Sequence, residues 1–448
     1  MEIKDLLKQQ PGQQVTAKGW IRFNRVSKNI GFITLFDGTD LDGIQIVYKI
    51  ENEELFAKLS KATQYSSVVI EGTTVESRDG GVEINASNLV SINLNEDEKF
   101  PIGKKEHGLE FLREVAHLRG KTKLFQSIMK IRSVAAQAIH EDFALNGWVN
   151  IHAPIITGND AEGAGEAFYI TTTEGETFWD KQASLTVSGQ LHAEGYAQAV
   201  GKVYTFGPTF RAENSNTSRH ANEFWMMEPE AAFHDYQEMM SVGERNIKFA
   251  AKKVLDHCKK ELDFLSKYFE KDLESNIKNI IENDFHRISY KEAITILNEA
   301  ISQGVEFENT NIEFGTDLGS EHERYLSEKK FDGPVYVHDY PTSIKSFYMY
   351  QNGDGTCRGF DLLVPGIGEL IGGSERETRY DVLLETIESK GLNKDEMRLD
   401  WYIDLRKQGY SQSSGYGLGF ERLIMLLTGV ENIRDTLPFP RTPGKIEY

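Results

Sequence analysis

The chain has 448 residues, of which 39% are hydrophobic and 11% aromatic, so it can form two or three globular domains and is not a disordered protein. It has only two cysteines and no apolar run of membrane-spanning length, which excludes a disulfide framework, a cysteine-built zinc site and a transmembrane helix. The formal net charge of −19 argues against nucleic-acid binding over the whole surface. We expect a cytoplasmic protein without a signal or transit peptide.

Residues 15–90 show the alternating pattern of short strands separated by turn-rich breaks. A helix is predicted over residues 51–63, between the third and the fourth strand. Five strands with one helix after the third favour a small barrel of the oligonucleotide-binding (OB) kind, and a piece of a β-sandwich is the alternative. We expect this domain to cover residues 1–98 and a polar hinge to cover residues 99–120.

The remainder of the chain predicts a second, larger domain. Apolar residues recur at helical spacing over residues 124–143, and an extended segment follows them. Residues 238–330 are mainly helical in pattern and are predicted to be an insertion. Strands return from residue 335 onward, and one of them is predicted at residues 346–353. The fold class is therefore α+β, with an antiparallel sheet flanked by helices over residues 121–448.

The polar string FRAENSNTSRHANEF lies between two predicted strands at residues 210–224. It holds Arg211, Arg219 and His220, and an arginine guanidinium matches two phosphate oxygens in a plane. The ring of Phe224 offers a face on which a base can stack. The string predicts an anion-binding hairpin, and a solvated hairpin with surface arginines is the alternative.

Two further strings carry chemistry. In GYGLGFERLIMLL at residues 415–427, a run of glycines leads to Arg422 at the start of an apolar helix, without the spacing of the known nucleotide-binding loops. In residues 360–376, Asp361 and Glu369 flank a turn, and carboxylates near bound phosphates commonly hold Mg²⁺. Taken alone, this acidic pair is equally compatible with exposed strand residues.

Together these strings resemble the motifs of class II aminoacyl-tRNA synthetases, and among them the asparaginyl branch of the aspartyl, asparaginyl and lysyl subgroup. Residues 124–154 are similar to motif 1, residues 210–224 to motif 2, and GLGFERL at residues 417–423 to motif 3. The barrel resembles the anticodon-binding domain. The resemblance spans nearly the whole chain. It implies an ATP-dependent ligase that joins L-asparagine to tRNA(Asn) with Mg²⁺, and a homodimer formed through residues 121–154.

The resemblance also implies roles for single residues. Arg211 would bind the α-phosphate of ATP, Arg422 would cover the adenine and touch the γ-phosphate, and both would be catalytic together with Glu369. The other implied ATP-binding residues are Glu213 and Phe224 at the adenine, and Arg219 and His220 at the γ-phosphate. Mg²⁺ is expected on Glu369 with Asp361 nearby. Gly372 stands where aspartyl relatives often have a serine, so a water molecule is the alternative for the second ligand.

The choice between asparagine and aspartate depends on a few positions. Ser188-Gly-Gln190-Leu-His-Ala193 resembles an aspartyl string in which a lysine, three residues after the glutamine, neutralises the substrate carboxylate; here that position is Ala193. A carboxylate at Glu228 accepts a hydrogen bond from an amide and repels a carboxylate, which favours asparagine. The residues expected to bind asparagine are Glu166, Ser188, Gln190, Glu228 and Arg376.

Three alternatives to this function remain open. They are an aspartyl or relaxed enzyme that charges both tRNAs, a catalytically silent paralogue that binds RNA or an amino acid, and a tRNA-independent asparagine synthetase. Ala193 and Glu228 argue against the first, and the presence of Arg211, Glu369 and Arg422 argues against the second. The third is expected to lack the barrel.

The barrel carries the expected tRNA contacts. Phe32 and Gln45 match barrel positions that stack on and hydrogen-bond the middle uridine of the anticodon; for Phe32, a core position is the alternative. Arg22 and Arg25 are expected to contact RNA, with plain surface charge as their alternative. Within residues 15–49 the basic residues outnumber the acidic ones, so the acidity of the whole chain is compatible with a local cationic surface.

Overall fold

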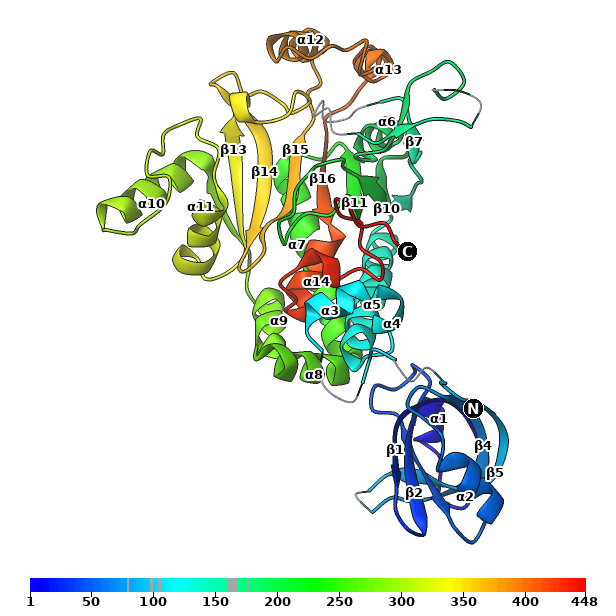
Figure 1. Cartoon of the computed structure of the whole chain (residues 1–448). Coiled ribbons are helices and arrows are strands. Elements are labelled where there is room, and N and C mark those ends of the chain that lie inside the picture. Colours follow the sequence, from blue (N-terminus) through cyan, green and yellow to red (C-terminus); the bar gives the residue numbers. More distant parts are fainter. Residues whose placement is uncertain (79, 97–99, 104–106, 160–166, 174, 176) are drawn as a thin grey trace. The chain divides into compact units, whose positions relative to one another are not determined.

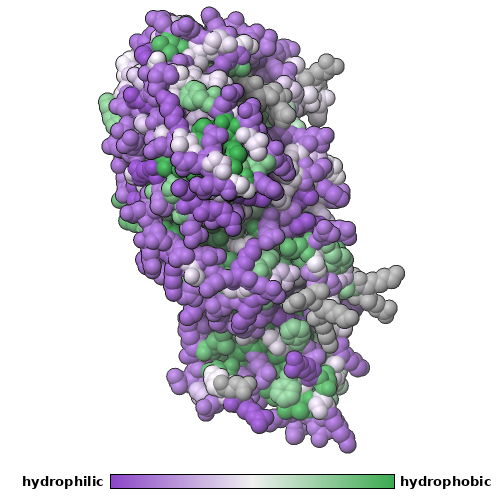
Figure 2. Space-filling view, turned by 90° about the vertical axis from the view of Figure 1, so that its left-hand side faces the viewer, coloured by the Kyte–Doolittle hydropathy of each residue, from purple (hydrophilic) through white to green (hydrophobic). Residues whose placement is uncertain are grey.

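The structure is a computed structural model that describes residues 1–78, 80–96, 100–103, 107–159, 167–173, 175 and 177–448. It divides into two compact units, Met1–Ser127 and Ile128–Tyr448 (Figure 1). Within the described residues, no helix combines the length and the hydrophobicity needed to cross a membrane. The face drawn in Figure 2 is mostly hydrophilic, with apolar residues in scattered patches.

The first unit contains a closed five-stranded barrel, as the sequence predicts. Its strands are β1 (Gln14–Val26), β2 (Ile30–Phe36), β3 (Ile44–Lys49), β4 (Ser67–Glu76) and β5 (Val82–Asn93), in the order β1-β2-β3-β5-β4. A helix, α2 (Glu53–Leu59), follows the third strand and begins at Asn52, whose side chain accepts the backbone N–H of Leu55. Inward-pointing aliphatic residues of the strands fill the barrel. The short helices of this unit are α1 (Ile3–Leu6), α3 (Leu109–Glu114) and α4 (Ala116–Arg119).

The second unit is built on an eight-stranded sheet in the order β12-β13-β14-β15-β16-β11-β10-β6. The strands are β6 (Val149–Asn150), β10 (Lys202–Phe210), β11 (Glu223–Ala232), β12 (His286–Ser289), β13 (Val335–Pro341), β14 (Thr356–Val364), β15 (Gly368–Glu375) and β16 (Ser413–Gly419). The six central strands are antiparallel, as predicted. The two edge pairs, β12 with β13 and β6 with β10, are parallel, because the long connections between them allow the chain to return in the same direction. The α+β class is confirmed.

Helices pack on this sheet and extend beyond it. They are α5 (Lys123–Leu145), α6 (Gln190–Val200), α7 (Tyr236–His257), α8 (Lys259–Phe269), α9 (Leu273–Glu282), α10 (Tyr290–Ser302), α11 (Ser320–Arg324), α12 (Tyr380–Ser389), α13 (Asp400–Asp404) and α14 (Phe420–Thr428). Helix α7 starts at a capping box formed by Asp235 and Glu238 and packs against β14, β15 and β16, while α6 packs against β10 and β11. A small separate sheet holds β7 (Ile156–Thr157), β8 (Tyr169–Ile170) and β9 (Ala183–Leu185).

One predicted strand is wrong. Residues 346–353 form turns with isolated bridges, in which Met349 pairs with Arg376 and Gln351 with Cys357. Phe347 and Tyr348 are buried in the core of the unit, so their aromatic character reflects burial and not a place in a strand ladder. The turn brings this segment to the wall of the cavity described below.

Candidate active site

The second unit contains a cavity of about 500 Å³. Strands β11, β14, β15 and β16 contribute to its wall, together with the start of α6 and the turn at residues 343–349. The predicted site residues in the lining are Ser188, Gln190, Arg211, Glu228, Asp361, Glu369 and Arg376. The fold therefore brings together predicted site residues that are up to 188 positions apart in the sequence, from Ser188 to Arg376.

One end of the cavity is built around Glu228 of β11, whose side chain is buried. Its carboxylate accepts hydrogen bonds from Ser188 Oγ at 2.5 Å, from the backbone N–H of Gly189 at 2.9 Å and from Thr205 Oγ1 at 3.0 Å. A Cβ atom at Gly189 would lie 3.0 Å from Glu228 Oε2, so a glycine allows this close approach. These donors fix the carboxylate at the cavity wall, where it remains available as an acceptor because a carboxylate has lone pairs beyond the three used here.

Gln190 is the first residue of α6 and lines the same end of the cavity. Its amide nitrogen is buried and makes no hydrogen bond within the described part of the chain. A buried polar group without a partner costs free energy, so this side chain is suited to bind a polar ligand in the cavity.

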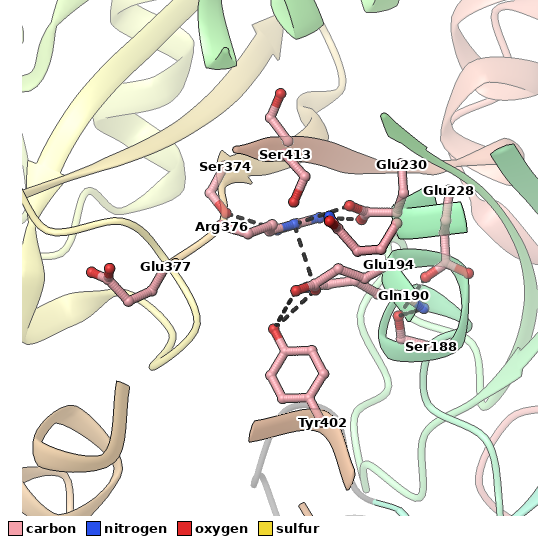
Figure 3. A network of polar contacts seen from close by, with 12 residues as sticks. Ser188, Gln190, Glu194, Glu228, Glu230, Ser374, Arg376, Glu377, Tyr402 and Ser413 are labelled. Carbon is pink, nitrogen blue, oxygen red and sulfur yellow. Dashed lines mark hydrogen bonds and ion pairs between the residues drawn. The ribbon is translucent and has the colours of Figure 1, made fainter. Parts of the chain in front are cut away.

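Arg376 lies at the end of β15, opposite Glu228, and is enclosed by acidic residues (Figure 3). It donates from Nε to Glu230 at 3.1 Å and from Nη1 to Ser374 Oγ at 2.7 Å, and its Nη2 forms a short bond with Glu230. Glu194 lies 3.9 Å from Nε. Burial alone would lower the pKa of Arg376, but Glu230 and Glu194 raise it well above its ordinary value.

Glu230 is surrounded by charged side chains of both signs. Burial raises the pKa of Glu230 to about 7, and the neighbouring carboxylates Glu194 and Glu228 act in the same direction, while Arg376 opposes the rise. The glycine that β16 places against it, Gly415, leaves the space that its carboxylate fills, because a Cβ there would lie 2.2 Å from Glu230. This end of the site thus concentrates carboxylates around one guanidinium group.

Glu194 was not found by the sequence reasoning. It lies on α6, is fully buried, and accepts hydrogen bonds from Tyr402 at 2.8 Å, from Tyr410 at 2.5 Å and from Arg406 Nη2 at 2.7 Å. The one signal in the sequence was its spacing, since it follows Gln190 by one helical turn.

The other end of the cavity holds the expected metal ligands. Lys345 binds Oδ2 of Asp361 at 2.5 Å. A Cβ atom at Gly372 would lie 2.9 Å from Glu369 Oε1 and 3.5 Å from Asp361 Oδ1, so the two carboxylates face each other across a space that the glycine keeps open. Hard carboxylate oxygens in this arrangement fit Mg²⁺. Within the described residues, however, no group of three or more histidine, cysteine or acidic residues forms a complete metal site.

A further acidic residue, Glu323 of α11, stands close to this pair. Burial raises the pKa of Glu323 to about 7, and Glu369 and Asp361 add to the rise. A Cβ at Gly368 would lie 2.8 Å from Glu323 Oε2 and 2.9 Å from Arg219 Nη1, so Glu323 and Arg219 converge on the backbone of Gly368. The sequence reasoning identified Arg219 but not Glu323.

The predicted ATP-binding residues occupy the hairpin between β10 and β11 and the start of α14. The guanidinium carbon of Arg211 lies 5.4 Å from the centre of the Phe224 ring. Arg422 donates from Nη1 to the backbone oxygen of Glu369 at 2.6 Å. Arg211 lines the cavity directly, and Arg422 reaches the backbone of β15 at Glu369.

Within the same hairpin, His220 pairs with Thr217 at 2.5 Å and its Nε2 lies 3.8 Å from Glu213. Arg219 approaches Glu323 as described above. These side chains belong to the polar loop that the sequence predicts.

Glu421, next to Arg422, has a structural role. It is buried and binds Arg132 of α5 at 2.7 Å and the backbone N–H of Trp225 at 2.9 Å. Burial raises the pKa of Glu421, and Arg132 counteracts the rise. These two bonds tie α14 to α5 and β11, which fixes the helix start from which Arg422 extends.

In the barrel, Phe32, Arg25 and Gln45 share an outward face. Arg25 is opposite Phe32 on β1 and β2, and Gln45 is opposite Thr34, two residues from Phe32, on β2 and β3. Phe32 is half-buried and does not belong to the barrel core, while Arg25 and Gln45 are exposed. Gln45 donates a hydrogen bond to Glu83 at 2.7 Å.

Arg22 does not have the surface position that a tRNA contact requires. It is 4% exposed, lies 4.3 Å from the ring of Phe36 and donates a hydrogen bond to Gln126 at 2.9 Å. Burial lowers its pKa. The expectation for Arg22 is therefore corrected: its guanidinium packs inside the first unit. Glu166, expected at the asparagine site, lies outside the described residues.

Two family models match the chain. The family model described as class II tRNA synthetases (D, K and N) matches residues 109–443, and the OB-fold nucleic acid binding domain matches residues 15–92. The chain is 50% identical to the asparagine–tRNA ligase of Mesoplasma florum over 443 residues, which is 97% of each chain. It is 46% identical to the asparagine–tRNA ligase of Malacoplasma penetrans over 451 residues, which is 100% of this chain and 99% of that protein.

Solved structures agree with these relatives. The asparaginyl-tRNA synthetase of Pyrococcus horikoshii, complexed with asparaginyl-adenylate, superposes with a TM-score of 0.89 at 34% sequence identity. The alignment covers 100% of this chain and 99% of that one.

Proposed function

The chain belongs to the class II tRNA synthetases (D, K and N), and on that premise we propose that it is an asparagine–tRNA ligase. It activates L-asparagine with ATP to asparaginyl-adenylate, releases pyrophosphate, and transfers the asparaginyl group to the 3′ end of tRNA(Asn). The observation that carries the proposal is the pair Glu228 and Arg376 at one end of the cavity, with no lysine at Ala193. An acceptor facing a donor suits the amide of asparagine.

The first step joins the α-carboxylate of asparagine to the α-phosphorus of ATP. The nucleophile is already an anion, so the step requires orientation and positive charge but no protein base. Arg211 provides this charge at the α-phosphate, and Arg422 provides it at the γ-phosphate. Phe224 and Glu213 hold the adenine, and Arg219 and His220 contact the γ-phosphate. The arginines thus stabilise the charge that develops as pyrophosphate leaves.

Mg²⁺ fits the second end of the cavity, with Glu369 and Asp361 as its protein ligands. When bound, the ion neutralises phosphate charge and orients the polyphosphate. Oδ2 of Asp361 is occupied by Lys345, so Oδ1 and the Glu369 carboxylate are the oxygens available to the ion. Gly372 offers no side-chain oxygen, so water would take the place of a second side-chain ligand there.

Asparagine is bound at the end of the cavity that is built around Glu228 and Arg376. Ser188, Gln190 and Glu166 hold its α-ammonium group, Glu228 accepts a hydrogen bond from the amide nitrogen, and Arg376 donates to the amide oxygen. Ala193 stands where the aspartyl string has its lysine, so an aspartate carboxylate would enter this end without that lysine to neutralise it. Such an unpaired buried charge is strongly disfavoured.

The barrel recognises the anticodon of tRNA(Asn). Phe32 stacks on a base and Gln45 hydrogen-bonds to it, while Arg25 lies on the same outward face and contacts the RNA. Stacking of a base on an aromatic side chain contributes about 1–3 kcal/mol. We assign residues 1–98 to this domain, residues 99–120 to a hinge, and residues 121–448 to the catalytic domain, with residues 238–330 as its insertion.

The protein forms a homodimer through residues 121–154. Four apolar side chains at the end of this segment and just beyond it are exposed, namely Leu145 at 71%, Val149 at 46%, Ile155 at 45% and Ile156 at 47%. Exposed apolar patches commonly mark interaction surfaces. We also assign the enzyme to the cytoplasm, where tRNA charging takes place and where two buried, free cysteines stay reduced.

Pyrophosphate exchange tests the proposal. Purified enzyme with ATP and Mg²⁺ is expected to exchange pyrophosphate into ATP with asparagine and not with aspartate, and then to charge tRNA(Asn). Exchange with both amino acids would favour the relaxed enzyme. Exchange with neither would favour the silent paralogue and overturn the proposal.

A further inference from the structure

Glu194 lies one helical turn after Gln190 on α6, so both side chains leave the same face of the helix (Figure 3). We propose that Glu194 determines specificity through Arg376: its negative charge makes the guanidinium suitable for a neutral amide and unsuitable for a substrate carboxylate. The inference rests on the proposed function, because it concerns how the same cavity rejects aspartate.

The contacts of Glu194 explain why this charge is held in place. Its carboxylate accepts hydrogen bonds from the hydroxyl groups of Tyr402 and Tyr410 and from Arg406. Its Oε2 atom lies 3.9 Å from Arg376 Nε. Arg406 is itself anchored to the backbone oxygens of Glu377 and Tyr402. Glu194 therefore has fixed donors on one side and Arg376 on the other.

The charges at this end of the cavity are unequal. Three buried carboxylates, Glu194, Glu228 and Glu230, stand against the two guanidinium groups of Arg376 and Arg406. Arg376 already binds Glu230 through both Nε and Nη2. Its charge is thus neutralised by the protein before a substrate arrives.

Substrate choice follows from this imbalance. The N–H groups of Arg376 that make no bond to Glu230 or Ser374 can donate to an amide oxygen, which requires no excess positive charge. A carboxylate in the same place would meet a surplus of negative charge in a region of low dielectric constant. Glu228 touches the substrate directly, whereas Glu194 acts on the substrate through Arg376. We therefore class Glu194 as a positioning and electrostatic residue.

Glu194→Gln tests the inference with little change in shape. We expect the variant to fold, because glutamine keeps the volume of the side chain and its oxygen still accepts from a tyrosine hydroxyl. The ratio of kcat/KM for asparagine to kcat/KM for aspartate in pyrophosphate exchange should fall about tenfold, which is the effect of about 1.4 kcal/mol. Competitive inhibition by aspartate should strengthen in parallel.

Arg406→Gln gives a second test of opposite sign. It removes a positive charge from the same cluster, so the asparagine-to-aspartate ratio should rise. A role limited to packing would impair both variants in the same direction, and a charge effect shifts the ratio in opposite directions. Thermal unfolding of each variant identifies any that does not fold, and the remaining variant then carries the test alone.

Glu375→Gln is the matched control. Glu375 is a buried carboxylate at the end of β15, bound to Arg358 at 2.5 Å and to Gln412 at 3.0 Å, and it does not line the cavity. The ratio should not change in this variant. A folded Glu194→Gln enzyme with the wild-type ratio would overturn the inference, whereas a wild-type enzyme inactive with asparagine would overturn the proposed function instead.

Discussion

Lys345 donates a hydrogen bond to Asp361 at 2.5 Å inside the candidate active site. Burial alone would lower the pKa of Lys345, but Asp361 and Glu369 raise it above its ordinary value. Burial raises the pKa of Asp361, and Lys345 opposes that rise. The ammonium group therefore occupies one oxygen of a carboxylate that we assign to Mg²⁺, and the two cations share a single acidic cluster.

Removing this ammonium should tighten metal binding. In Lys345→Gln, Asp361 loses its competing cation, so we expect the Mg²⁺ concentration that half-saturates pyrophosphate exchange to fall by about threefold or more. The maximal rate should fall as well, because Lys345 lines the cavity. Lys248→Gln is the control, since Lys248 forms a comparable ion pair with Glu244 at 2.7 Å on α7, outside the cavity lining. An unchanged or higher Mg²⁺ requirement in Lys345→Gln would contradict the idea that Lys345 and Mg²⁺ compete for Asp361.

Glu323 should make Mg²⁺ use depend on pH. Its folded-state pKa of about 7 lies above the ordinary value of 4.5, so the native protein binds more protons than the unfolded chain between these values, and its stability falls as pH rises through this window. Below pH 7 the side chain is neutral and the acidic cluster loses charge. We therefore expect the half-saturating Mg²⁺ concentration to rise as pH falls from 8 to 6.

Glu323→Gln should flatten this pH dependence, because the variant has no proton to gain. Glu321→Gln is the matched control: backbone N–H groups of Asn309 and Glu308 lower the pKa of Glu321, so it stays ionised throughout the range. Mg²⁺ titrations of exchange at several pH values distinguish the three proteins. Equal slopes for the wild type and Glu323→Gln would show that another group titrates.

Much of the fold follows from local patterns, and the exceptions have physical causes. Alternation predicted the barrel, yet Arg22 was placed on the wrong side. A β-bulge shifts the β1–β2 register between Ile21 and Phe23, so Ile21 and Arg22 are buried in succession, and alternation cannot hold across such a bulge. The strand predicted at residues 346–353 failed because burial and not pairing explains its aromatic residues.

The site residues could be predicted where they stand at fixed positions within a recognisable sequence motif. Glu228 and Glu369 reach the cavity from strands β11 and β15, and Ser188 reaches it from the segment just before α6. Glu194 was out of reach, because an acidic residue within a helix normally faces solvent. Its partner Tyr402 is 208 residues away in the sequence, and only the fold brings them together.

The barrel face of Phe32 should affect charging without affecting activation. Phe32→Ala removes a stacking surface worth about 1–3 kcal/mol, so KM for tRNA in aminoacylation should rise roughly 5- to 150-fold. Pyrophosphate exchange with asparagine should be unchanged. Phe56→Ala is no control, because Phe56 packs against the barrel core. Val90→Ala serves instead, because Val90 is an exposed, uncharged residue of β5. A loss of exchange activity in Phe32→Ala would point to a folding role.

Glu228→Gln should cost asparagine affinity and weaken the rejection of aspartate. The carboxylate accepts from Ser188, Gly189 and Thr205, and a glutamine amide group turned toward any of them places a donor against a donor. The loss of one charged acceptor is worth about 1.5–3 kcal/mol, so KM for asparagine should rise about tenfold or more. The same exchange assay with aspartate should show a gain relative to asparagine.

Glu228→Gln differs from Glu194→Gln in one respect: it disturbs a residue that touches substrate. The KM for asparagine should therefore change far more in Glu228→Gln than in Glu194→Gln. Unchanged discrimination in Glu228→Gln would refute the assignment of this carboxylate to the amide.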